Sequence, residues 1–373
     1  MNIIYFFPEY GVPMFNWQRM HIIGELKLHG VDIETFNPLL YNSPEEANDA
    51  FLKKLSSSRY DLLMSSVCYE GMIFPSVLDK AKQLGIPSLC IRWDNLTIPF
   101  YDRKQASKFD LLWLTAKVTA WMYDKWNAKY IFQPYAANPY LLKYNETDIK
   151  RNVCFIGTPY GSRSLMINKL TSKKIAVDLY YGKNPELKEN EEKLAVKYEM
   201  VTPGKWGTIL EWFKFREGRK ILQGSILNRF KGGTQVEENP CLGRYPSQDL
   251  KKIPLLYSQY ALCLSSTSTN HTDSLKKPLK IVNLRAFEIP MSGGIEFCKY
   301  NEELSSYFEE GKEIIFYRTD EELVEKANFY LKKATDRELK EIKTAARKRS
   351  EREHTWWNRF TKVFDTLGLK YEK

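Results

Sequence analysis

The chain has 373 residues, of which 43% are hydrophobic and 27% charged, and it carries a formal net charge of +10. This length predicts two domains, and the composition is that of a globular protein and excludes a largely disordered one. The positive charge favours anionic partners such as nucleotides, phosphorylated substrates or an acidic membrane surface. Nucleic acid is not expected, because no recognised binding motif is visible and the basic residues are spread along the chain.

The first eight residues form an apolar run without a preceding positive charge. The run is much shorter than a signal-peptide core or a membrane span, so we expect a buried first strand and a cytoplasmic protein. Six cysteines are scattered along the chain and none forms a Cys-x-x-Cys pair. They are expected to be small core residues and not a disulfide or zinc framework.

In the N-terminal half, short β-rich apolar runs alternate with amphipathic stretches, which is the pattern of a parallel sheet with crossover helices. A helical stripe over 17–29, ended by Gly30, separates the first two runs and predicts a β-α-β unit. The strands predicted in this half are 3–7, 31–36, 61–67, 88–93, 110–114 and 130–133.

A polar stretch over 143–151 interrupts this pattern and predicts a domain boundary, after which the alternation restarts. We therefore expect an acceptor-side domain over 1–145, a donor domain over 146–350 and a final helix over 351–373. The strands predicted in the second half are 152–157, 175–181, 261–265, 295–298 and 313–317. The helices predicted there are 162–170, 248–260, 281–291, 301–308, 321–334 and 336–367, whereas 185–240 remains unassigned.

The segment from Leu284 to Gly294 resembles the donor-binding helix and turn of GT-B glycosyltransferases, in which a Glu precedes a Gly-containing turn. More narrowly, it is similar to the CgeB-like (spore maturation protein) glycosyltransferase group. That group has an Arg-x-Phe-Glu segment, a Gly pair, a strand and then a Glu-Leu-x-x-x-Phe-x-x-Gly-Lys-Glu run. The matching residues here are Arg285, Phe287, Glu288, Gly293, Gly294, Glu303, Leu304, Phe308, Gly311, Lys312 and Glu313.

Three further matches occur in the order expected for this group. The run 152–157 with Arg163 resembles the strand, Gly loop and Arg that open the C-terminal domain. Arg92 to Asn95 resembles a strand end of the N-terminal domain. His354 to Trp356 with Arg359 resembles the start of the last helix. The resemblance implies an α/β protein of GT-B architecture. Two Rossmann-like, doubly wound parallel-sheet domains would face a cleft, with the C-terminal helix crossing back to the N-terminal domain.

The resemblance also implies transfer of a sugar from a nucleotide diphosphate sugar to a glycan, glycolipid or protein acceptor, in bacterial cell-envelope polysaccharide biosynthesis. Two alternatives stay open: a nucleotide-sugar epimerase or hydrolase of the same fold, and a non-catalytic protein that binds nucleotide or glycan. Epimerases and hydrolases need acid and base groups that face the sugar ring, and the presence of only four histidines counts mildly against them.

Candidate donor-binding residues follow from the chemistry of a nucleotide diphosphate. Glu288 is proposed to bind the ribose hydroxyls, because a carboxylate accepts two hydrogen bonds from a vicinal diol; the alternative is a helix-surface Glu. Gly-containing turns at helix N-termini let backbone amides approach phosphate oxygens, which selects Gly157 and the turn Ser292, Gly293 and Gly294. Positive charges that would neutralise the diphosphate in the transition state are expected from Arg163, Arg229 and Lys231.

Candidate acceptor-side residues follow the strands of the N-terminal half, because ligands of open parallel sheets bind beyond the carboxyl ends of the strands. Glu9, Glu70 and Asp94 occupy such positions. An inverting enzyme needs a general base, for which Asp94 and Glu70 are the candidates, whereas in a retaining enzyme Asp94 would position the acceptor.

Glu288 and Glu296 have the spacing of a catalytic Glu pair in many retaining GT-B enzymes, but in those enzymes a Gly-containing stretch follows the second Glu. Here such a stretch follows Glu288, so Glu288 corresponds to the second Glu of the pair and Lys280 to the first. We therefore expect Glu296 to be strand structure. No Asp-x-Asp signature is present and histidines are few, so no metal and no cofactor are expected.

The tail from Arg347 to Phe360 is basic and aromatic, which would suit peripheral contact with an anionic membrane at its inner face. The preferred interpretation is a closing helix, because Trp356, Phe360, Val363, Phe364 and Leu367 form one packing stripe.

Overall fold

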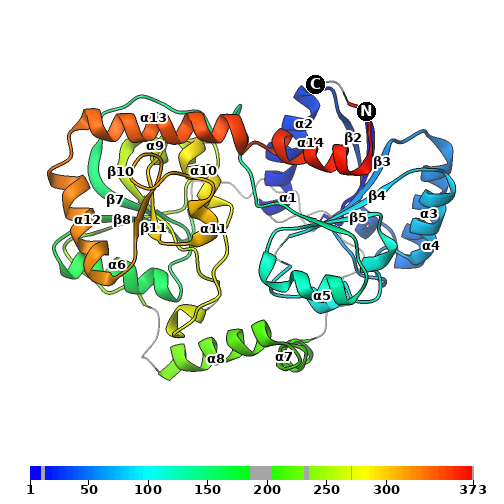
Figure 1. Cartoon of the computed structure of the whole chain (residues 1–373), viewed down its shortest axis with the longest axis horizontal. Coiled ribbons are helices and arrows are strands. Elements are labelled where there is room, and N and C mark those ends of the chain that lie inside the picture. Colours follow the sequence, from blue (N-terminus) through cyan, green and yellow to red (C-terminus); the bar gives the residue numbers. More distant parts are fainter. Residues whose placement is uncertain (10–12, 94, 185–203, 231–234, 270, 372–373) are drawn as a thin grey trace. The chain divides into compact units, whose positions relative to one another are not determined.

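The computed structural model describes residues 1–9, 13–93, 95–184, 204–230, 235–269 and 271–371. Contacts divide the chain into two compact units, each built around one sheet (Figure 1). Unit 1 comprises Met1–Pro134, Glu189–Glu217 and Trp356–Lys373, and unit 2 comprises Tyr135–Lys188 and Gly218–Thr355. Among the described residues, no helix has both the length and the apolar character needed to cross a membrane.

Unit 1 contains six parallel strands in the order β2-β1-β3-β4-β5-β6. All six strands predicted for the N-terminal half are present, because strands buried on both faces of a parallel sheet read as continuous apolar runs. The strands are β1 Asn2–Phe6, β2 Asp32–Phe36, β3 Leu62–Ser65, β4 Ser88–Arg92, β5 Leu111–Leu114 and β6 Tyr130–Phe132.

The helices of unit 1 begin and end with recognisable capping chemistry. Before α3, the Ser43 hydroxyl accepts a hydrogen bond of 3.2 Å from the Glu46 amide, and Pro44 occupies the first helical position. Gly30 and Gly85 end α2 and α4 with φ values of 73° and 71°. The helices are α1 Pro13–Gln18, α2 Gly24–Leu28, α3 Pro44–Ser57, α4 Pro75–Gln83, α5 Ala120–Lys125, α7 Lys205–Phe213 and α14 Trp356–Leu367.

The predicted helix over 17–29 is not one regular α-helix. A π-helical turn, Arg19–Ile23, separates α1 from α2, and the Gly24 amide bonds to the Arg19 carbonyl five residues earlier. This wider turn keeps the consecutive residues His21, Ile22 and Ile23 buried, which a regular 3.6-residue period would not place on one face.

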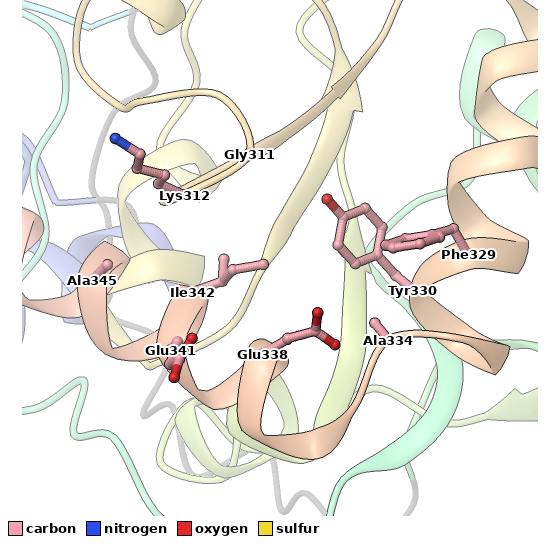
Figure 2. Close-up of a pocket in the computed structure, with 9 residues that line it drawn as sticks. All are labelled: Gly311, Lys312, Phe329, Tyr330, Ala334, Glu338, Glu341, Ile342 and Ala345. Carbon is pink, nitrogen blue, oxygen red and sulfur yellow. The ribbon is translucent and has the colours of Figure 1, made fainter.

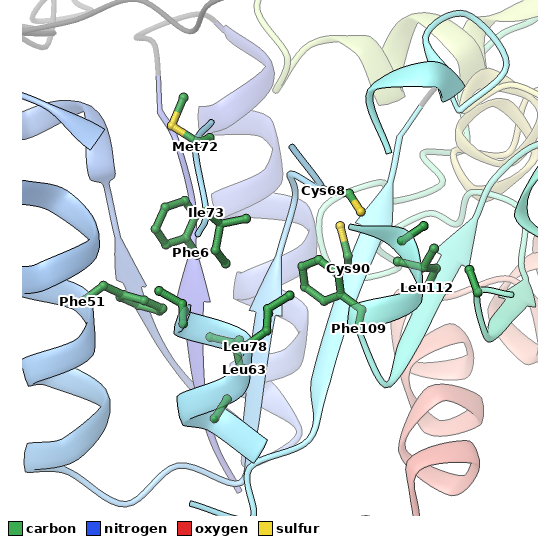
Figure 3. Packing of buried hydrophobic residues seen from close by; sticks show 14 of the residues in the cluster. Phe6, Phe51, Leu63, Cys68, Met72, Ile73, Leu78, Cys90, Phe109 and Leu112 are labelled. Atoms are coloured by element: carbon green, nitrogen blue, oxygen red, sulfur yellow. The ribbon is translucent and has the colours of Figure 1, made fainter. Parts of the chain in front are cut away.

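The core of unit 1 consists of aliphatic and aromatic side chains between the sheet and its helices (Figure 3). Phe6 of β1 packs edge-on against Phe51 of α3, with ring centroids 5.1 Å apart. Cys68 and Cys90 lie within the same cluster. All six cysteines are free thiols. Five are buried, which confirms them as core residues, whereas Cys241 is half-buried.

The last helix, α14, belongs to unit 1, which confirms the expected crossing of the C-terminal helix to the N-terminal domain. The buried Trp356 ring lies 5.7 Å from the Trp17 ring and 5.8 Å from the Trp93 ring, and Phe360 packs edge-on against Trp113. The Gln133 side chain, which follows β6, donates a 2.6 Å hydrogen bond to the carbonyl of Arg359. The apolar stripe of the tail is thus part of the core of unit 1.

Unit 2 contains six parallel strands in the order β9-β8-β7-β10-β11-β12. Five of them were predicted from the sequence, and β9 was missed because its residues are polar and partly exposed. The strands are β7 Lys150–Ile156, β8 Val177–Tyr180, β9 Leu242–Tyr245, β10 Tyr260–Leu264, β11 Glu296–Lys299 and β12 Ile315–Tyr317.

The predicted helix over 336–367 is two helices, which are interrupted at His354 and Thr355. There the Ala137 amide donates a 2.9 Å hydrogen bond to the His354 carbonyl, and Thr355 pairs with Ala137 in a β-bridge. This tertiary pairing competes with the continuation of the helical hydrogen bonds. The remaining helices are α6 Ser162–Ser172, α8 Arg216–Phe230, α9 Ile253–Gln259, α10 Arg285–Met291, α11 Glu302–Ser305, α12 Asp320–Lys332 and α13 Asp336–Glu353.

Replacement of Trp356 by alanine is expected to lower the free energy of unfolding by about 3–5 kcal/mol, because a large cavity would remain among Trp17, Trp93 and Trp113. Urea unfolding followed by circular dichroism measures the change. Trp121→Ala on α5 is the matched control, because Trp121 is exposed, and it should shift the midpoint little. Equal shifts for the two variants would contradict the assigned role of α14.

Candidate functional site

The carboxyl edge of the sheet in unit 2 has a binding position between β7 and β10. The strand order reverses at this pair, since β7 is followed in the chain by strands on one side and β10 by strands on the other. In open parallel sheets, ligands bind at such a reversal, beyond the carboxyl ends of the strands. β7 ends at Ile156 and β10 at Leu264, so Gly157 and Ser265 begin the segments that border this position.

Gly157 is held directly against the guanidinium group of Arg285. Its φ of 121° is rarely adopted by residues with a side chain, and a Cβ at this position would collide with Nη2 of Arg285. Arg285 is the first residue of α10, the helix that carries Glu288. The glycine therefore allows a positive charge to approach the end of β7 more closely than any other residue would permit.

Arg163 supplies a second positive charge beside the same loop. It lies in the first turn of α6, stacks over the Tyr160 ring at 4.2 Å and donates a 3.1 Å hydrogen bond to the Thr158 carbonyl. Burial lowers the pKa of Arg163, and the charge of Arg285 adds to this decrease, while Tyr160 and Asp273 oppose it. Two positive charges beside one loop make it favourable for an anion.

Three buried polar atoms near these arginines have no hydrogen-bond partner among the described residues: Nδ1 of His271, Oδ2 of Asp273 and Oδ1 of Asn283. The rings of His271 and Tyr160 lie 6.1 Å apart, and the Asn283 amide donates to the Ser266 carbonyl at 2.5 Å. Buried polar groups in native proteins are nearly always hydrogen-bonded, so this group of atoms indicates a ligand position.

The turn that carries His271 is supported by α8. A Cβ at Gly224 would lie 2.8 Å from the His271 carbonyl oxygen, so only glycine permits this contact. The Ser274 hydroxyl donates to the Gly224 carbonyl at 3.3 Å and to the His271 carbonyl at 2.7 Å. α8, which the sequence did not assign, thus positions one side of the site.

A cavity of about 220 Å³ lies next to these residues, between the first turns of α6 and the carboxyl ends of β10, β11 and β12. Its lining combines polar and apolar surface and has charged groups of both signs. The lining residues are Ser162, Leu165, Met166, Lys169, Ser266, Ser268, Asp273, Lys299, Tyr317 and Asp320.

Glu288 lies in α10, three residues after Arg285, and is half-buried. Both residues act on the phenol of Tyr257: burial raises the pKa of Tyr257, the charge of Arg285 opposes the shift and that of Glu288 adds to it. Residues three apart on a helix are neighbours on one face. The structure therefore places Glu288 on the same helix face as Arg285. The sequence analysis had not identified Arg285 as a site residue.

The predicted turn of Ser292, Gly293 and Gly294 lies at the other end of α10. Ser292 is its C-cap, and its hydroxyl donates a 2.7 Å hydrogen bond to the Glu288 carbonyl. Gly293, with φ 72°, lies against the Tyr144 ring, and Gly294 leads to the amino end of β11. The structure thus places this turn at a helix C-terminus and not at the N-terminus that was expected.

The other predicted residues lie elsewhere or outside the described ranges. Arg229 is exposed near the end of α8, Lys231 lies outside the described residues, and so does Asp94. In unit 1, Glu70 follows β3 and forms an ion pair with Lys104. None of these residues is therefore placed beside Arg163 by the described structure.

The residues on either side of Asp94 are firmly held in unit 1. The Arg92 guanidinium bonds to the buried Asp102 carboxylate at 2.7 Å. The Asn95 side chain accepts hydrogen bonds from the amides of Thr115 and Ala116 at 3.0 and 2.8 Å. These contacts fix Arg92 and Asn95, whereas Asp94 itself lies outside the described residues.

A larger cavity of about 400 Å³ lies at the amino edge of the unit 2 sheet, between the end of α12, the start of α13 and the turn before β12 (Figure 2). Charged groups in its lining are already engaged: Glu338 caps α13 through Thr335, and Lys312 pairs with Glu309 at 2.6 Å. It lies at the opposite edge from Gly157 and shares none of its residues with the site.

Glu296 is almost fully buried in β11, which confirms the expectation that it belongs to a strand. The Ser265 hydroxyl donates a 2.5 Å hydrogen bond to its Oε1. Burial raises the pKa of Glu296 to about 7, while Ser265, Cys298 and the charge of Arg285 oppose the shift.

Comparisons with known proteins agree with this architecture. Residues 234–365 match the family described as "Glycosyl transferase-like". A search of curated proteins finds no match to the chain.

Among solved structures, the chain is similar to Anabaena HepE in complex with UDP and glucose, with 11% sequence identity, 99% of each chain covered and a TM-score of 0.57. It is similar to sucrose-phosphate synthase from Thermosynechococcus elongatus, with 12% identity, 98% and 99% coverage and a TM-score of 0.55. An alpha-glucosyltransferase in complex with UDP and a 13-mer DNA has 13% identity, 99% coverage of both chains and a TM-score of 0.57. The chain has the GT-B fold over nearly its whole length.

Replacement of Gly157 by alanine is expected to destabilise unit 2 and displace Arg285, because it combines an unfavourable φ with a steric collision. Gly182→Ala is the matched control: its φ is 99°, but no atom lies within 4 Å of the added Cβ. Thermal unfolding should show a loss of about 1 kcal/mol for both variants, because the Arg285 guanidinium ends a flexible side chain and can move aside. Only Gly157→Ala should weaken UDP binding in a calorimetric titration, and equal UDP binding by the two variants would show that the contact with Arg285 is not restrictive.

The raised pKa of Glu296 predicts a pH-dependent stability. The folded protein holds this proton more tightly than the unfolded chain, so the contribution is complete below about pH 4.5 and is lost as the pH rises through about 7. Glu296→Gln keeps a neutral side chain at every pH. Its free energy of unfolding, relative to that of the unaltered protein, should therefore rise by about 3 kcal/mol between about pH 5 and about pH 8. Urea unfolding at both pH values measures this gain, and a constant difference would contradict the shifted pKa.

Proposed function

We propose that this protein is a glycosyltransferase that moves a sugar from a nucleotide diphosphate sugar to a glycan, glycolipid or protein acceptor. We further propose that it belongs to the CgeB-like group and acts in the cytoplasm, in bacterial cell-surface polysaccharide biosynthesis. The family match over 234–365 and the GT-B fold support the transferase class. UDP is the first nucleotide to consider, because similar structures contain UDP.

The observation that carries the proposal is the pair of guanidinium groups of Arg163 and Arg285 beside the Gly157 loop. A diphosphate has negative charge on both phosphate groups, and arginine binds phosphate oxygens through paired N–H donors. The start of α6 adds backbone amides and the positive end of a helix dipole. These groups lie at the carboxyl edge where open parallel sheets bind ligands.

The same pair suits the chemistry of transfer. When the glycosidic bond breaks, negative charge grows on the departing diphosphate, and fixed positive groups stabilise that charge without reorganising. Arg163 is fixed by its bond to Thr158 and its stacking on Tyr160, and the Arg285 guanidinium lies directly against Gly157. Both arginines are therefore proposed to stabilise the leaving group, and Arg229 and Lys231 remain candidates for additional contacts.

Glu288 is proposed to accept hydrogen bonds from the ribose hydroxyls. Glu288 lies in α10, which begins at Arg285 and is capped at its C-terminus by Ser292. The Ser292 hydroxyl donates a hydrogen bond to the Glu288 carbonyl. Ser292, Gly293 and Gly294 are thus proposed to contribute by ending α10 at the correct residue. The unpartnered atoms of His271, Asp273 and Asn283 are further candidates for nucleotide or sugar contacts.

On the acceptor side, Asp94 is proposed as general base or acceptor-positioning residue, with Glu70 as the alternative. Glu70 would have to exchange its ion pair with Lys104 for the acceptor hydroxyl. We propose that transfer requires no metal ion, because positive side chains rather than a cation would neutralise the diphosphate; activity that EDTA leaves unchanged would agree with this.

Nucleotide binding tests the donor site directly. The full chain should show a higher melting temperature with at least one of UDP, GDP, CMP and dTDP. Arg163→Gln, Arg285→Gln and Glu288→Gln should each weaken that nucleotide's binding by roughly tenfold to a hundredfold, since each removes one charge-assisted contact. Arg337→Gln is the control, because Arg337 is exposed on α13 and pairs with Glu341. If no nucleotide raises the melting temperature, the donor-site assignment is wrong.

Product analysis with the corresponding nucleotide sugar then separates the reaction classes. Release of nucleotide that depends on an acceptor fraction supports transfer. Release without acceptor indicates a hydrolase, a changed sugar on intact nucleotide indicates an epimerase, and binding without turnover indicates a non-catalytic protein.

A further inference from the structure

The cavity of about 400 Å³ at the amino edge of the unit 2 sheet has the features of a second binding site (Figure 2). This amino-edge pocket lies between residues 311–312, 329–334 and 338–345. Its lining comes from a stretch of chain that the structure describes without interruption. Its volume is in the range of roughly 300–1,000 Å³ that is usual for small-ligand sites.

One wall of the amino-edge pocket is aromatic. The rings of Phe329 and Tyr330 are perpendicular, at an angle of 89°, and their centroids are 5.1 Å apart. Tyr330 is half-buried, whereas Phe329 is 45% exposed. Edge-to-face packing is a favourable arrangement of two rings, so the exposed Phe329 ring is held in a defined orientation. It offers an apolar surface to the C–H groups of a ligand.

The same pocket contains a hydrogen-bond donor and an acceptor. The Tyr330 hydroxyl makes no hydrogen bond with any of the described residues. The amide and hydroxyl of Thr335 donate hydrogen bonds of 2.7 and 2.8 Å to Oε2 of Glu338. Oε1 of Glu338 accepts none from the described part of the chain. Figure 2 shows Tyr330 and the Glu338 carboxylate bordering the same space, so both groups are available to one ligand.

The charges around Tyr330 disfavour an anionic ligand. Burial raises the pKa of Tyr330, and the negative charges of Glu310 and Glu338 add to this increase. The phenol therefore remains a protonated donor that lies beside carboxylates. These carboxylates would repel a phosphate or a nucleotide, in contrast to the arginines beside Gly157.

The remaining charged groups of the pocket do not call for a cation. Glu341 pairs with Arg337 at 2.9 Å, and Lys312 pairs with Glu309 at 2.6 Å. Figure 2 shows the Lys312 amino group directed away from Tyr330. Glu338 lies in the first turn of α13, where the helix dipole stabilises a negative charge. An uncharged ligand with hydroxyl groups and an apolar face fits this environment.

We propose that the amino-edge pocket binds an uncharged sugar unit of the acceptor glycan. The C–H face of the sugar would lie against Phe329, one hydroxyl would donate to Glu338 and another would accept from Tyr330. This inference rests on the proposed glycosyltransferase function, which supplies a glycan as the ligand. Because the pocket lies at the sheet edge opposite Gly157, the bound unit is remote from the reacting end of the glycan. Such a second contact retains a long acceptor between successive transfers.

Saturation-transfer NMR with the full chain tests this site. The probes are maltohexaose, cellohexaose, laminarihexaose and chitohexaose, each with and without saturating UDP. At least one of them should bind, and UDP should not displace it. Phe329→Ala should weaken its binding by about tenfold and Tyr330→Phe by about threefold, since they remove the apolar surface and one hydrogen bond.

Trp121→Ala is the matched control, because Trp121 is an aromatic residue of unit 1 that is 43% exposed. It should bind the oligosaccharide like the unaltered protein, and all three variants should keep the melting temperature and the nucleotide binding. The inference is wrong if none of the four oligosaccharides binds, or if Trp121→Ala weakens binding as much as Phe329→Ala. Displacement by UDP, or loss of binding in Arg163→Gln, would place the sugar at the donor site and would also overturn it.

The failure of this inference is distinguishable from the failure of the proposed function. Oligosaccharide binding is measured without a nucleotide sugar, and nucleotide binding without an oligosaccharide. A chain that binds a nucleotide but none of the four oligosaccharides would refute the pocket alone. A chain that binds an oligosaccharide through Phe329 but no nucleotide would refute the donor site alone.

Discussion

The candidate site depends on one close approach, that of the Arg285 guanidinium to Gly157 at the end of β7. A Cβ at this position would collide with the guanidinium group and displace it, so the residue just after β7 affects where a charge from α10 lies. Arg163 is held beside the same loop by Thr158 and Tyr160. The protein thereby maintains two like charges in proximity, an arrangement that an anionic ligand would relieve.

A bound ligand beside the two arginines would also provide hydrogen-bond partners for the buried polar atoms around the loop. Nδ1 of His271, Oδ2 of Asp273 and Oδ1 of Asn283 are removed from solvent without a partner among the described residues. Such a group of atoms costs folding energy unless something binds there. Their positions are supported by contacts such as the approach of Gly224 to His271 and the bond from Asn283 to Ser266. A site that is rigid before binding loses little conformational freedom when it binds.

The sequence predicted the fold well, because buried parallel strands are continuous apolar runs that alternate with helical stripes. It also proposed Gly157, Arg163 and Glu288 as donor-site residues, and all three lie in unit 2. It did not identify Arg285, although this residue lies one helical turn before Glu288, because the face that a helix turns towards a ligand is set by packing. His271 and Asp273 lie in a loop without periodicity, and the two glycines after Ser292 serve a helix C-terminus instead of a phosphate turn. The break at His354 arises from a pairing with Ala137, more than 200 residues away in the chain, which no local pattern contains.

The buried indole of Trp356 affects the order in which the two units complete their folding during synthesis. Unit 1 begins with the first strand but includes α14, so the rings of Trp17, Trp93 and Trp113 lack one neighbour until the ribosome has synthesised almost the entire chain. Unit 2 has all of its strands and helices by Thr355 and can be completed earlier. The part of the protein that is translated first is therefore finished last, and nascent chains that stall before α14 would present an uncovered aromatic surface to chaperones.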